Sequence, residues 1–459
     1  MITKENRGST SAIVAGMQGF EPLFRGKKIT MLGLGLLGRG VGDAEFLALC
    51  GAEVTVTDTK TESELAESVG RLKHFANITF HLGGHREEDF TNADLVIKAA
   101  GVRLDSPEVA VALSAGVPVS MSTALFAKYA SEAGVKIVGV TGTRGKSTIS
   151  HMIFHVLKSA GRRVHLGGNV RGISTLAMLP EVQPGDVAVL ELDSWQLQGF
   201  GELEMSPHVA VFTNLMPDHQ NYYTSMDEYF ADKANIFRFQ HPGDALVVGH
   251  SVEDRVRAAS ASWRTPVDLT VPGDLPKDWQ LNIPGGHNRY NASLASSALL
   301  ALGLTADAIH AGLETFDGVE GRLQLVGEKG GVKIYNDNNA TTPEATIAAL
   351  RALHEGERNS LILIAGGSDK GLDLTELVSE IQKTCKAVML LAGTGTDTLK
   401  EKLHAAEVFQ NLNTAVDAAF AVATPGDTIL FSPAFASFGM FKNEYDRNDQ
   451  FLALIKLHL

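Results

Sequence analysis

Short runs rich in aliphatic and β-branched residues alternate with helix-length segments along almost the whole chain, and this alternation limits the possible folds most. Strands separated by helices form parallel sheets joined by right-handed crossovers. The pattern therefore predicts an α/β protein. The expected strands lie at 28–35, 53–59, 95–101, 136–142, 187–192, 209–214, 361–367, 387–393 and 428–434.

The length of 459 residues exceeds the size at which a single hydrophobic core keeps growing, so we expect about three domains. The run SEAGVK (131–136) ends one αβ block, and the turn-rich stretch GRLQLVGEKGGVK (321–333) is interpreted as a joint before another. The domains are accordingly expected at residues 1–133, 134–324 and 325–459.

Composition and charge exclude several classes of protein. No run approaches the roughly 18 apolar residues that a membrane span needs, and the start MITKENRGSTS lacks the apolar core of a signal peptide. A cytoplasmic protein without membrane insertion is expected. The net charge of −13 argues against nucleic-acid binding. Cys50 and Cys385 suggest neither a disulfide framework nor a zinc site.

The stretch VTGTRGKSTIS (140–150) is typical of a phosphate-binding loop between a strand and a helix. The N–H groups of the loop and of the helix N-terminus converge on one point, which suits an anion. Gly142 and Gly145 permit close backbone approach, Lys146 offers a cation, and the Ser147 hydroxyl can reach Mg²⁺. The familiar pattern has its first glycine two residues earlier, so this loop is shorter than usual.

Polar residues then follow two expected strands of the same sheet. Glu191 ends VAVLE, and Asn214, Asp218 and His219 follow VAVFT. Lys233 comes later, in the helical pattern DEYFADKANIF. Open α/β sheets bind ligands at strand ends, and carboxylate with imidazole suits a nucleotide-bound Mg²⁺. Taken singly, each residue is equally consistent with a helix cap, a surface histidine or a solvated lysine.

Through these motifs the chain resembles the Mur ligases, the ATP-dependent amide-forming enzymes of peptidoglycan synthesis, over nearly its full length. The shortened loop Gly-x-x-Gly-Lys-Ser is the form that this family uses. The stretches LELDSWQL, NDNNAT and SPAFASFGMFKN are most similar to members that join D-glutamate to UDP-N-acetylmuramoyl-L-alanine. The resemblance implies an N-terminal Rossmann-like UDP-sugar domain, a central P-loop ATPase-like parallel sheet, and a C-terminal Rossmann-like amino-acid domain.

The resemblance also implies roles for single residues. The catalytic residues would be Lys146, Glu191, His219 and Lys233. ATP would contact Gly142, Thr143, Arg144, Gly145, Lys146, Ser147, Thr148, Asn288, Asn291, Arg322 and Asp337. The UDP sugar would contact Leu36, Leu37, Asp58, Thr59, Gly101 and Asn169. The incoming amino acid would contact Thr341, Lys370, Ser437 and Phe438. Two Mg²⁺ ions would be held by Ser147, Glu191, His219 and a carbamylated Lys233. The partners would be small-molecule substrates, and a monomer is expected.

A second glycine-rich turn leaves an alternative open. In KKITMLGLGLLGRG, residues Gly33, Gly35 and Gly38 precede Asp58 by the spacing of a dinucleotide-binding fingerprint. Taken alone, this turn supports an NAD-dependent oxidoreductase, but that function gives no use to the phosphate loop. A switch-type ATPase is a third hypothesis.

The phosphate and metal positions match the family pattern. Several other positions depart from it, and these departures bear on which substrate is accepted. A sister ligase that adds a different amino acid to a related precursor therefore also stays open. The departures are Ala99 and Ala100 in the usual Ser-Pro-Gly, Asp193 for serine, Gly321 for histidine, Asn339 for lysine and Glu444 for phenylalanine.

Overall fold

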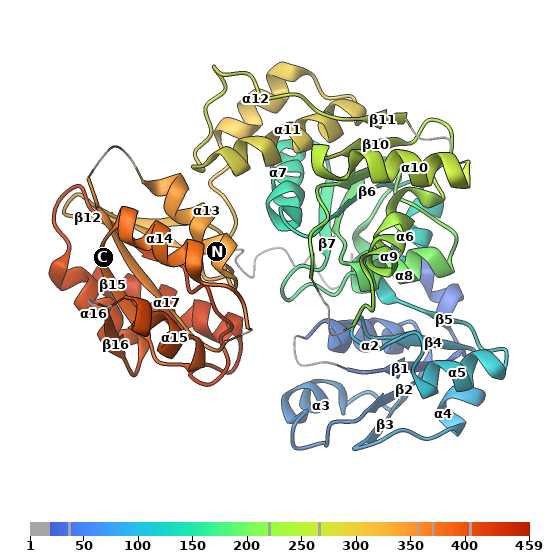
Figure 1. The fold of residues 1–459 in the computed structure, drawn as a ribbon. Helices are drawn as coiled ribbons and strands as arrows, with labels where there is room; N and C mark the ends of the chain where they lie inside the picture. Colours follow the sequence, from blue (N-terminus) through green and yellow to red (C-terminus); the bar gives the residue numbers. More distant parts are fainter. Residues whose placement is uncertain are drawn as a thin grey trace. The chain divides into compact units, whose positions relative to one another are not determined.

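The computed structural model describes residues 19–34, 38–218, 222–264, 268–354, 356, 358–369, 371–403 and 406–459. Its elements are labelled in Figure 1. The strands form three sheets, and the contacts divide the chain into two compact units. The first unit holds Met1–Gly273 and Leu294–Ile309, and the second holds Asp274–Ser293 and His310–Leu459.

The first sheet is fully parallel, with the strand order β3-β2-β1-β4-β5. Its strands are β1 (Lys28–Leu32), β2 (Glu53–Asp58), β3 (Ile78–Leu82), β4 (Leu95–Lys98) and β5 (Val119–Ser120). The helices of this segment are α2 (Arg39–Leu49), α3 (Ala66–Leu72), α4 (Glu88–Thr91), α5 (Pro107–Ser114) and α6 (Ser122–Glu132).

The second sheet is also parallel, with the order β11-β10-β9-β6-β8-β7. Its strands are β6 (Lys136–Thr141), β7 (Val164–Gly168), β8 (Val187–Glu191), β9 (Val209–Phe212), β10 (Ala245–Val248) and β11 (Asp268–Thr270). The helices here are α7 (Lys146–Ser159), α8 (Ser194–Glu202), α9 (Met226–Arg238), α10 (Glu253–Trp263) and the 3-10 helices η2 (Leu176–Glu181) and η3 (His250–Val252).

One hydrophobic core joins these two sheets within the first unit. It runs from Met31 of β1 through Phe46 of α2 and Phe126 of α6 to Leu190 of β8 and Phe212 of β9. Because buried apolar surface is continuous between the sheets, separating them would expose it to water at a free-energy cost. The strand ends of the two sheets are therefore held in a fixed relation to each other.

The third sheet belongs to the second unit and has the order β12-β13-β17-β14-β15-β16. Its strands are β12 (Gln324–Lys329), β13 (Val332–Asn336), β14 (Leu361–Gly366), β15 (Cys385–Leu391), β16 (Glu407–Phe409) and β17 (Thr428–Phe431). The remaining helices are α11 (Gly286–Ala301), α12 (Ala306–Glu314), α13 (Pro343–Leu353), α14 (Thr375–Thr384), α15 (Thr394–Lys402), α16 (Leu412–Val422) and α17 (Glu444–His458).

Strand β14 shows how this sheet buries both faces. Leu361 and Leu363 belong to a core formed with α13, α14 and α15, whereas Ile362 and Ile364 belong to a core formed with α16 and α17. Side chains alternate between the two faces of a strand, so a strand covered on both sides is apolar throughout. This explains why LILIAG shows no polar alternation.

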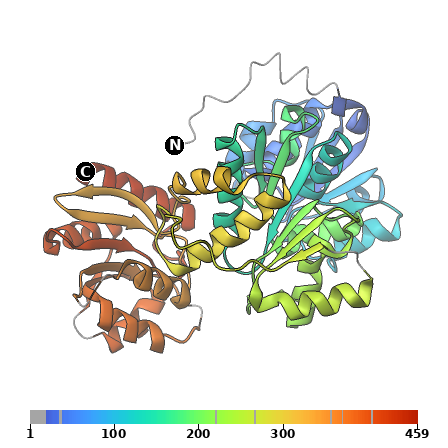
Figure 2. The ribbon, with the colours of Figure 1, turned by 90° about the horizontal axis from the view of Figure 1, so that it is seen from above.

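The predicted α/β class is confirmed, and each of the nine expected strands is present and ends slightly earlier than expected. The stretch 321–333 differs from its interpretation as a joint. It contributes the antiparallel hairpin of β12 and β13, which forms the edge of the third sheet (Figure 2). Gly330 and Gly331 connect the strands at φ of 58° and 79°, which suits a two-residue hairpin turn. In the described part of the chain, no helix combines the length and apolar character that crossing a membrane requires.

Candidate functional site

The loop between β6 and α7 requires glycine at two positions. Gly142 has φ of 137° and Gly145 has φ of 86°, values that favour glycine. A Cβ atom at Gly142 would lie 1.9 Å from Oγ1 of Thr213, so no larger residue fits there. The loop leads directly into the first turn of α7, where Ser147 and Thr148 are buried.

Residues Thr213 and Asn214, which follow β9, hold this loop in place through hydrogen bonds. The N–H of Arg144 donates to Oδ1 of Asn214 at 2.9 Å, and the N–H of Thr143 donates to the Asn214 carbonyl at 3.0 Å. Oγ1 of Thr213 donates to the Arg144 carbonyl at 2.6 Å. Sequence reasoning singled out Asn214 but missed Thr213, because a threonine after a strand carries no signal of its own.

Two lysine amines meet at one carbonyl of the loop. Nζ of Lys146 donates to the Gly142 carbonyl at 3.0 Å and to the Thr143 carbonyl at 3.1 Å. Nζ of Lys233 donates to the same Gly142 carbonyl at 3.0 Å and to Oγ1 of Thr141 at 3.4 Å. The phosphate loop and α9 therefore lie next to each other.

Lys233 is 1% exposed, and its amine lies 4.7 Å from the centre of the Tyr229 ring. Burial lowers the pKa of this amine well below its usual value, and the nearby charge of Lys146 lowers it further. The environment therefore favours the neutral amine, which is the nucleophilic form of a lysine.

Glu191 ends β8 opposite Val140 of β6 and Gly168 of β7, and it is 4% exposed. Its carbonyl accepts from the N–H of Asn169 at 2.7 Å. Asp193, the departure two residues later, is the N-cap of α8 in a reciprocal capping box with Gln196. The carboxylate at position 193 thus has a structural use.

His219 lies outside the described residues. Among the residues that are described, no three or more His, Cys, Asp or Glu side chains are grouped so as to hold a metal ion. Of the expected metal ligands, Glu191 ends β8, Ser147 lies in the first turn of α7 and Lys233 lies on α9.

A cavity of about 240 Å³ lies between the first two sheets in the first unit. Gly33 of the glycine turn, Gly101 after β4 and Gly168 of β7 are among the residues that line it. Nη1 of Arg39, another lining residue, donates to Oδ1 of Asn169 at 2.8 Å. Gly101 is therefore placed at the cavity, and Asn169 is tied to its wall by Arg39, which sequence reasoning did not single out.

Asp58 supports the glycine turn directly. Oδ2 accepts from the N–H of Leu34 at 3.0 Å, and Oδ1 accepts from the N–H of Lys60 at 2.9 Å. Thr59 is exposed next to it. The expected contacts Leu36 and Leu37 lie outside the described residues.

In the second unit, Asp337 follows β13 and is buried. Oδ1 accepts from the N–H of Leu323 at 3.0 Å, and Oδ2 accepts from Oγ of Ser432 at 2.8 Å. Burial raises the pKa of Asp337 to about 7, although both hydrogen bonds and the charge of Arg322 oppose the shift. A carboxyl with this pKa changes its charge in the physiological range.

Two departures from the family pattern, Gly321 and Asn339, are neighbours. The N–H of Asn339 donates to the Gly321 carbonyl at 2.9 Å. A Cβ atom at Gly321 would lie 3.0 Å from Nδ2 of Asn339, and Gly321 has φ of 71°. The two replacements therefore fit each other, a relation that the sequence did not show.

The other expected contacts of the second unit fall in two places. Asn288 and Asn291 lie near the start of α11, with Nδ2 of Asn291 3.4 Å from Oδ1 of Asn288. Ser437 is buried and Phe438 is 67% exposed. They follow Ala436, which pairs with Ser368 in an antiparallel bridge.

This β-bridge brings the segment of Ser437 beside the segment that leads to position 370. Lys370 itself lies outside the described residues. Thr341 is half-buried, two residues after Asn339.

Three successive segments of the chain match known protein families. Residues 27–121 match the Mur ligase MurD-like N-terminal domain, residues 140–271 the Mur ligase middle domain, and residues 321–435 the Mur ligase glutamate ligase domain. Two similar relatives are named UDP-N-acetylmuramoylalanine–D-glutamate ligase. The protein from Roseiflexus sp. (strain RS-1) is 35% identical, covering 94% of this chain and 98% of that one. The protein from Borreliella afzelii (strain PKo) is 33% identical, covering 93% and 97%.

Solved structures show the same fold. MurC from Thermotoga maritima aligns with a TM-score of 0.60 at 20% identity, covering 94% of this chain and all of that chain. MurF from Acinetobacter baumannii aligns with a TM-score of 0.59 at 16% identity, covering 95% and 92%. With relatives above 30% identity matched over nearly their whole length, the chain belongs to the Mur ligase family.

Proposed function

We propose that this protein is an ATP-dependent ligase that joins D-glutamate to UDP-N-acetylmuramoyl-L-alanine. The observation that carries the proposal is the glycine loop on which Lys146 and Lys233 converge, in a chain whose relatives bear the name of this ligase. Membership of the family favours a ligase over the oxidoreductase that the glycine turn alone suggests.

The substrates would be divided among three parts of the chain. Residues 1–133 and the cavity at Gly101 would hold the sugar nucleotide, and residues 134–324 with the phosphate loop would hold ATP. Residues 325–459, with Thr341, Lys370 and Ser437, would hold the amino acid. A fixed cation such as Lys370 suits a dicarboxylic amino acid.

The first chemical step joins two anions. A carboxylate oxygen of the sugar peptide attacks the γ-phosphorus of ATP, the bond to the β,γ-bridging oxygen breaks, and an acyl phosphate and ADP result. The chain must therefore position the anions and neutralise their charge, a role that we assign to the loop N–H groups and the Lys146 amine.

In the second step the amine of glutamate attacks the acyl carbon. The C–N bond forms, the C–O bond to phosphate breaks, the amine loses a proton and inorganic phosphate leaves. The hydrogen bonds of the loop to Thr213 and Asn214 hold its backbone in one conformation. A preorganised loop loses little energy to rearrangement during the reaction.

Magnesium fits the donor chemistry of the expected ligands. The Ser147 hydroxyl and the buried Glu191 carboxylate would supply hard oxygen donors of the kind that Mg²⁺ binds, and the family resemblance adds the imidazole of His219. When bound, the metal would supply positive charge to the phosphate oxygens. Two ions are proposed, as the family resemblance implies.

We also propose that Lys233 is carbamylated. A charged ammonium beside Lys146 would repel it, whereas a neutral amine can add to the carbon of CO₂ and lose a proton, giving a carbamate anion. The buried position, the shared carbonyl and the lowered pKa of the amine all support this modification.

Lys233→Ala tests the modification, because we expect it to lose most activity and to regain part of it when a short-chain carboxylic acid supplies the missing anion. Intact-protein mass spectrometry under ¹³CO₂ with chemical trapping of the carbamate gives a readout independent of turnover. Full activity of Lys233→Ala in CO₂-depleted buffer would contradict the proposal.

Isotope transfer tests the reaction. If the sugar-peptide carboxylate carries ¹⁸O, one labelled oxygen must appear in the phosphate released during turnover with D-glutamate. Phosphate without the label would rule out the acyl phosphate and would leave ATP hydrolysis of the switch type as the better description.

A further inference from the structure

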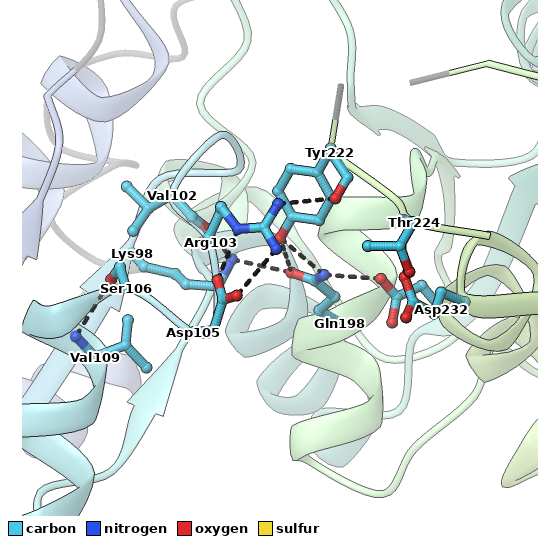
Figure 3. Close-up of polar contacts among 11 residues, drawn as sticks. Lys98, Val102, Arg103, Asp105, Ser106, Val109, Gln198, Tyr222, Thr224 and Asp232 are labelled. Atoms are coloured by element: carbon cyan, nitrogen blue, oxygen red, sulfur yellow. Dashed lines mark hydrogen bonds and ion pairs between the residues drawn. The ribbon is translucent and has the colours of Figure 1, made fainter. Parts of the chain in front are cut away.

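A series of polar side chains links the loop after β4 to helix α9 within the first unit (Figure 3). It begins at Lys98, which ends β4, is 3% exposed and lines the cavity between the two sheets. Nζ of Lys98 donates to the Val102 carbonyl at 2.9 Å and to Oε1 of Gln198 at 3.2 Å. The lysine thus closes the loop on itself and ties it to α8.

The series continues from Gln198, which is 5% exposed on α8. Its Nε2 donates to Oδ2 of Asp232 at 2.8 Å and to the hydroxyl of Tyr222 at 3.1 Å. The same Asp232 oxygen accepts from the hydroxyl of Tyr223 at 2.9 Å. Asp232 directly precedes Lys233, so the series ends at the turn of α9 that carries the proposed carbamate.

A second connection runs in parallel on the surface. Nη1 of Arg103 donates to the Tyr222 carbonyl at 2.8 Å, and its guanidinium lies 4.6 Å from the centre of the Tyr222 ring. Asp105 holds the same guanidinium through two hydrogen bonds of 2.7 and 3.0 Å. Tyr222 is the first described residue after the segment of His219.

We propose that Lys98, Gln198 and Asp232 form a positioning bridge that holds the cavity loop 99–105 against α9 and Tyr222. The inference rests on the proposed function, since it assigns the loop to the sugar nucleotide and α9 to the phosphate end. The bridge keeps the substrate carboxylate in reach of the phosphate. Gln198 and Asp232 are positioning residues and touch neither reactant.

The physical reason is the cost of removing hydrogen bonds from buried charged groups. Gln198 uses its carbonyl for Lys98 and its amide for Asp232, so an apolar replacement takes one hydrogen bond from each partner at once. The structure can relieve this only by letting water in, which releases the loop from α8. Loss of the bridge therefore weakens binding of the sugar nucleotide more than binding of ATP.

Gln198→Leu is the test variant, and Asp232→Asn is its conservative counterpart because the asparagine carbonyl still accepts hydrogen bonds. Asn235→Ala is the matched control. Nδ2 of Asn235 donates to the Leu197 carbonyl at 3.1 Å, so this variant removes a buried α8–α9 hydrogen bond outside the bridge. If Gln198→Leu fails to fold, Asp232→Ala at a half-buried position takes its place.

Steady-state kinetics in full-length enzyme give the first readout. We expect Gln198→Leu to raise the KM for UDP-N-acetylmuramoyl-L-alanine about tenfold and to lower kcat, with the KM for ATP within about twofold of wild type. Asp232→Asn should stay near wild type, and Asn235→Ala should leave both KM values unchanged. An unchanged KM in Gln198→Leu, or an equal rise in Asn235→Ala, overturns the bridge.

Hydrogen exchange gives a readout that needs no turnover. The N–H of Val102 donates to the Ala99 carbonyl and the N–H of Ser106 to the Arg103 carbonyl, so both report on the loop. Their exchange should be at least about tenfold faster in Gln198→Leu, while α7 is unchanged. Unaltered exchange refutes the bridge. Absence of ligation by the wild-type enzyme would instead refute the proposed function, and exchange would still decide the bridge.

Discussion

Replacing Asp337 by asparagine should change how the stability of the second unit depends on pH. The raised pKa of about 7, against 3.8 for an ordinary aspartate, means that the folded state binds a proton which the unfolded state has released. Burial of the carboxyl therefore does not lower the unfolding free energy below pH 3.8. As pH rises the unfolding free energy falls, and it is lowered by the full amount above pH 7. A difference of about three pKa units corresponds to about 4 kcal/mol.

Asparagine can keep the contacts of the buried carboxyl. Its carbonyl can accept from the N–H of Leu323, which holds that residue at φ of 46°, and its amide can donate to Oγ of Ser432. Oγ of Ser432 lies 2.9 Å from Oγ1 of Thr346 and keeps a partner there. The uncharged variant thus removes the penalty without leaving a polar group unsatisfied.

The measurement is the urea dependence of hydrogen exchange in β13 and β17, which reports unfolding of the second unit. Relative to wild type, Asp337→Asn should gain about 3 kcal/mol in unfolding free energy between pH 5 and pH 8. Its KM for ATP should rise as well, because the expected ATP contact at Asp337 loses its charge. A stability difference that stays constant over this pH range would refute the reasoning.

Three further substitutions test the loop and its surroundings. Lys146→Ala should lower kcat by roughly 100-fold or more with an unchanged circular dichroism spectrum, because it removes a cation from the transferring phosphate; activity near wild type would remove the loop from the mechanism. Gly142→Ala should force Thr213 away and lower the kcat/KM for ATP by at least about tenfold, whereas Gly70→Ala, which meets no atom within 4 Å, should have no such effect. Asp193→Ala should cost about 1 kcal/mol in urea denaturation by removing the N-cap of α8, and no loss of stability would contradict the capping role.

The strongly apolar strands of the fold could be predicted from the sequence because parallel strands buried on both faces are continuous apolar runs. Strand β10, ALVV, also has this property and was still missed, whereas other missed strands lack it. Strand β3 reads ITFHL and lies at a sheet edge, and β7 reads VHLGG with two glycines. Their pairing depends on neighbours that only the folded chain supplies.

The hairpin of β12 and β13 was missed for a different reason. Gly330 and Gly331 were interpreted as part of a joint, although a glycine pair between two alternating runs is also a hairpin signal. The cap at Asp193 had a readable signal too, since an aspartate three residues before Gln196 fits a capping box. Both features were open to sequence reasoning.

Other parts of the site could not be foreseen. That Thr213 touches the Arg144 carbonyl follows from the pairing of β6 with β9, which composition does not encode. The fit of Gly321 against Asn339 likewise appears only when the two segments are neighbours. Periodicity predicts which element a residue belongs to, whereas such contacts depend on sheet order and loop path.

The central claim is that this chain forms an amide bond between UDP-N-acetylmuramoyl-L-alanine and D-glutamate. The most direct measurement supplies the sugar nucleotide and ATP with D-glutamate, L-glutamate, D-aspartate, D-alanine, L-lysine or a diaminopimelate, and identifies each product by mass spectrometry alongside ADP. We predict a UDP-sugar product larger by one glutamyl residue, formed with D-glutamate at the highest rate and in a 1:1 ratio to ADP. Preferred use of another amino acid would contradict the assignment of the substrate, and ADP without any amide product would contradict the ligase itself.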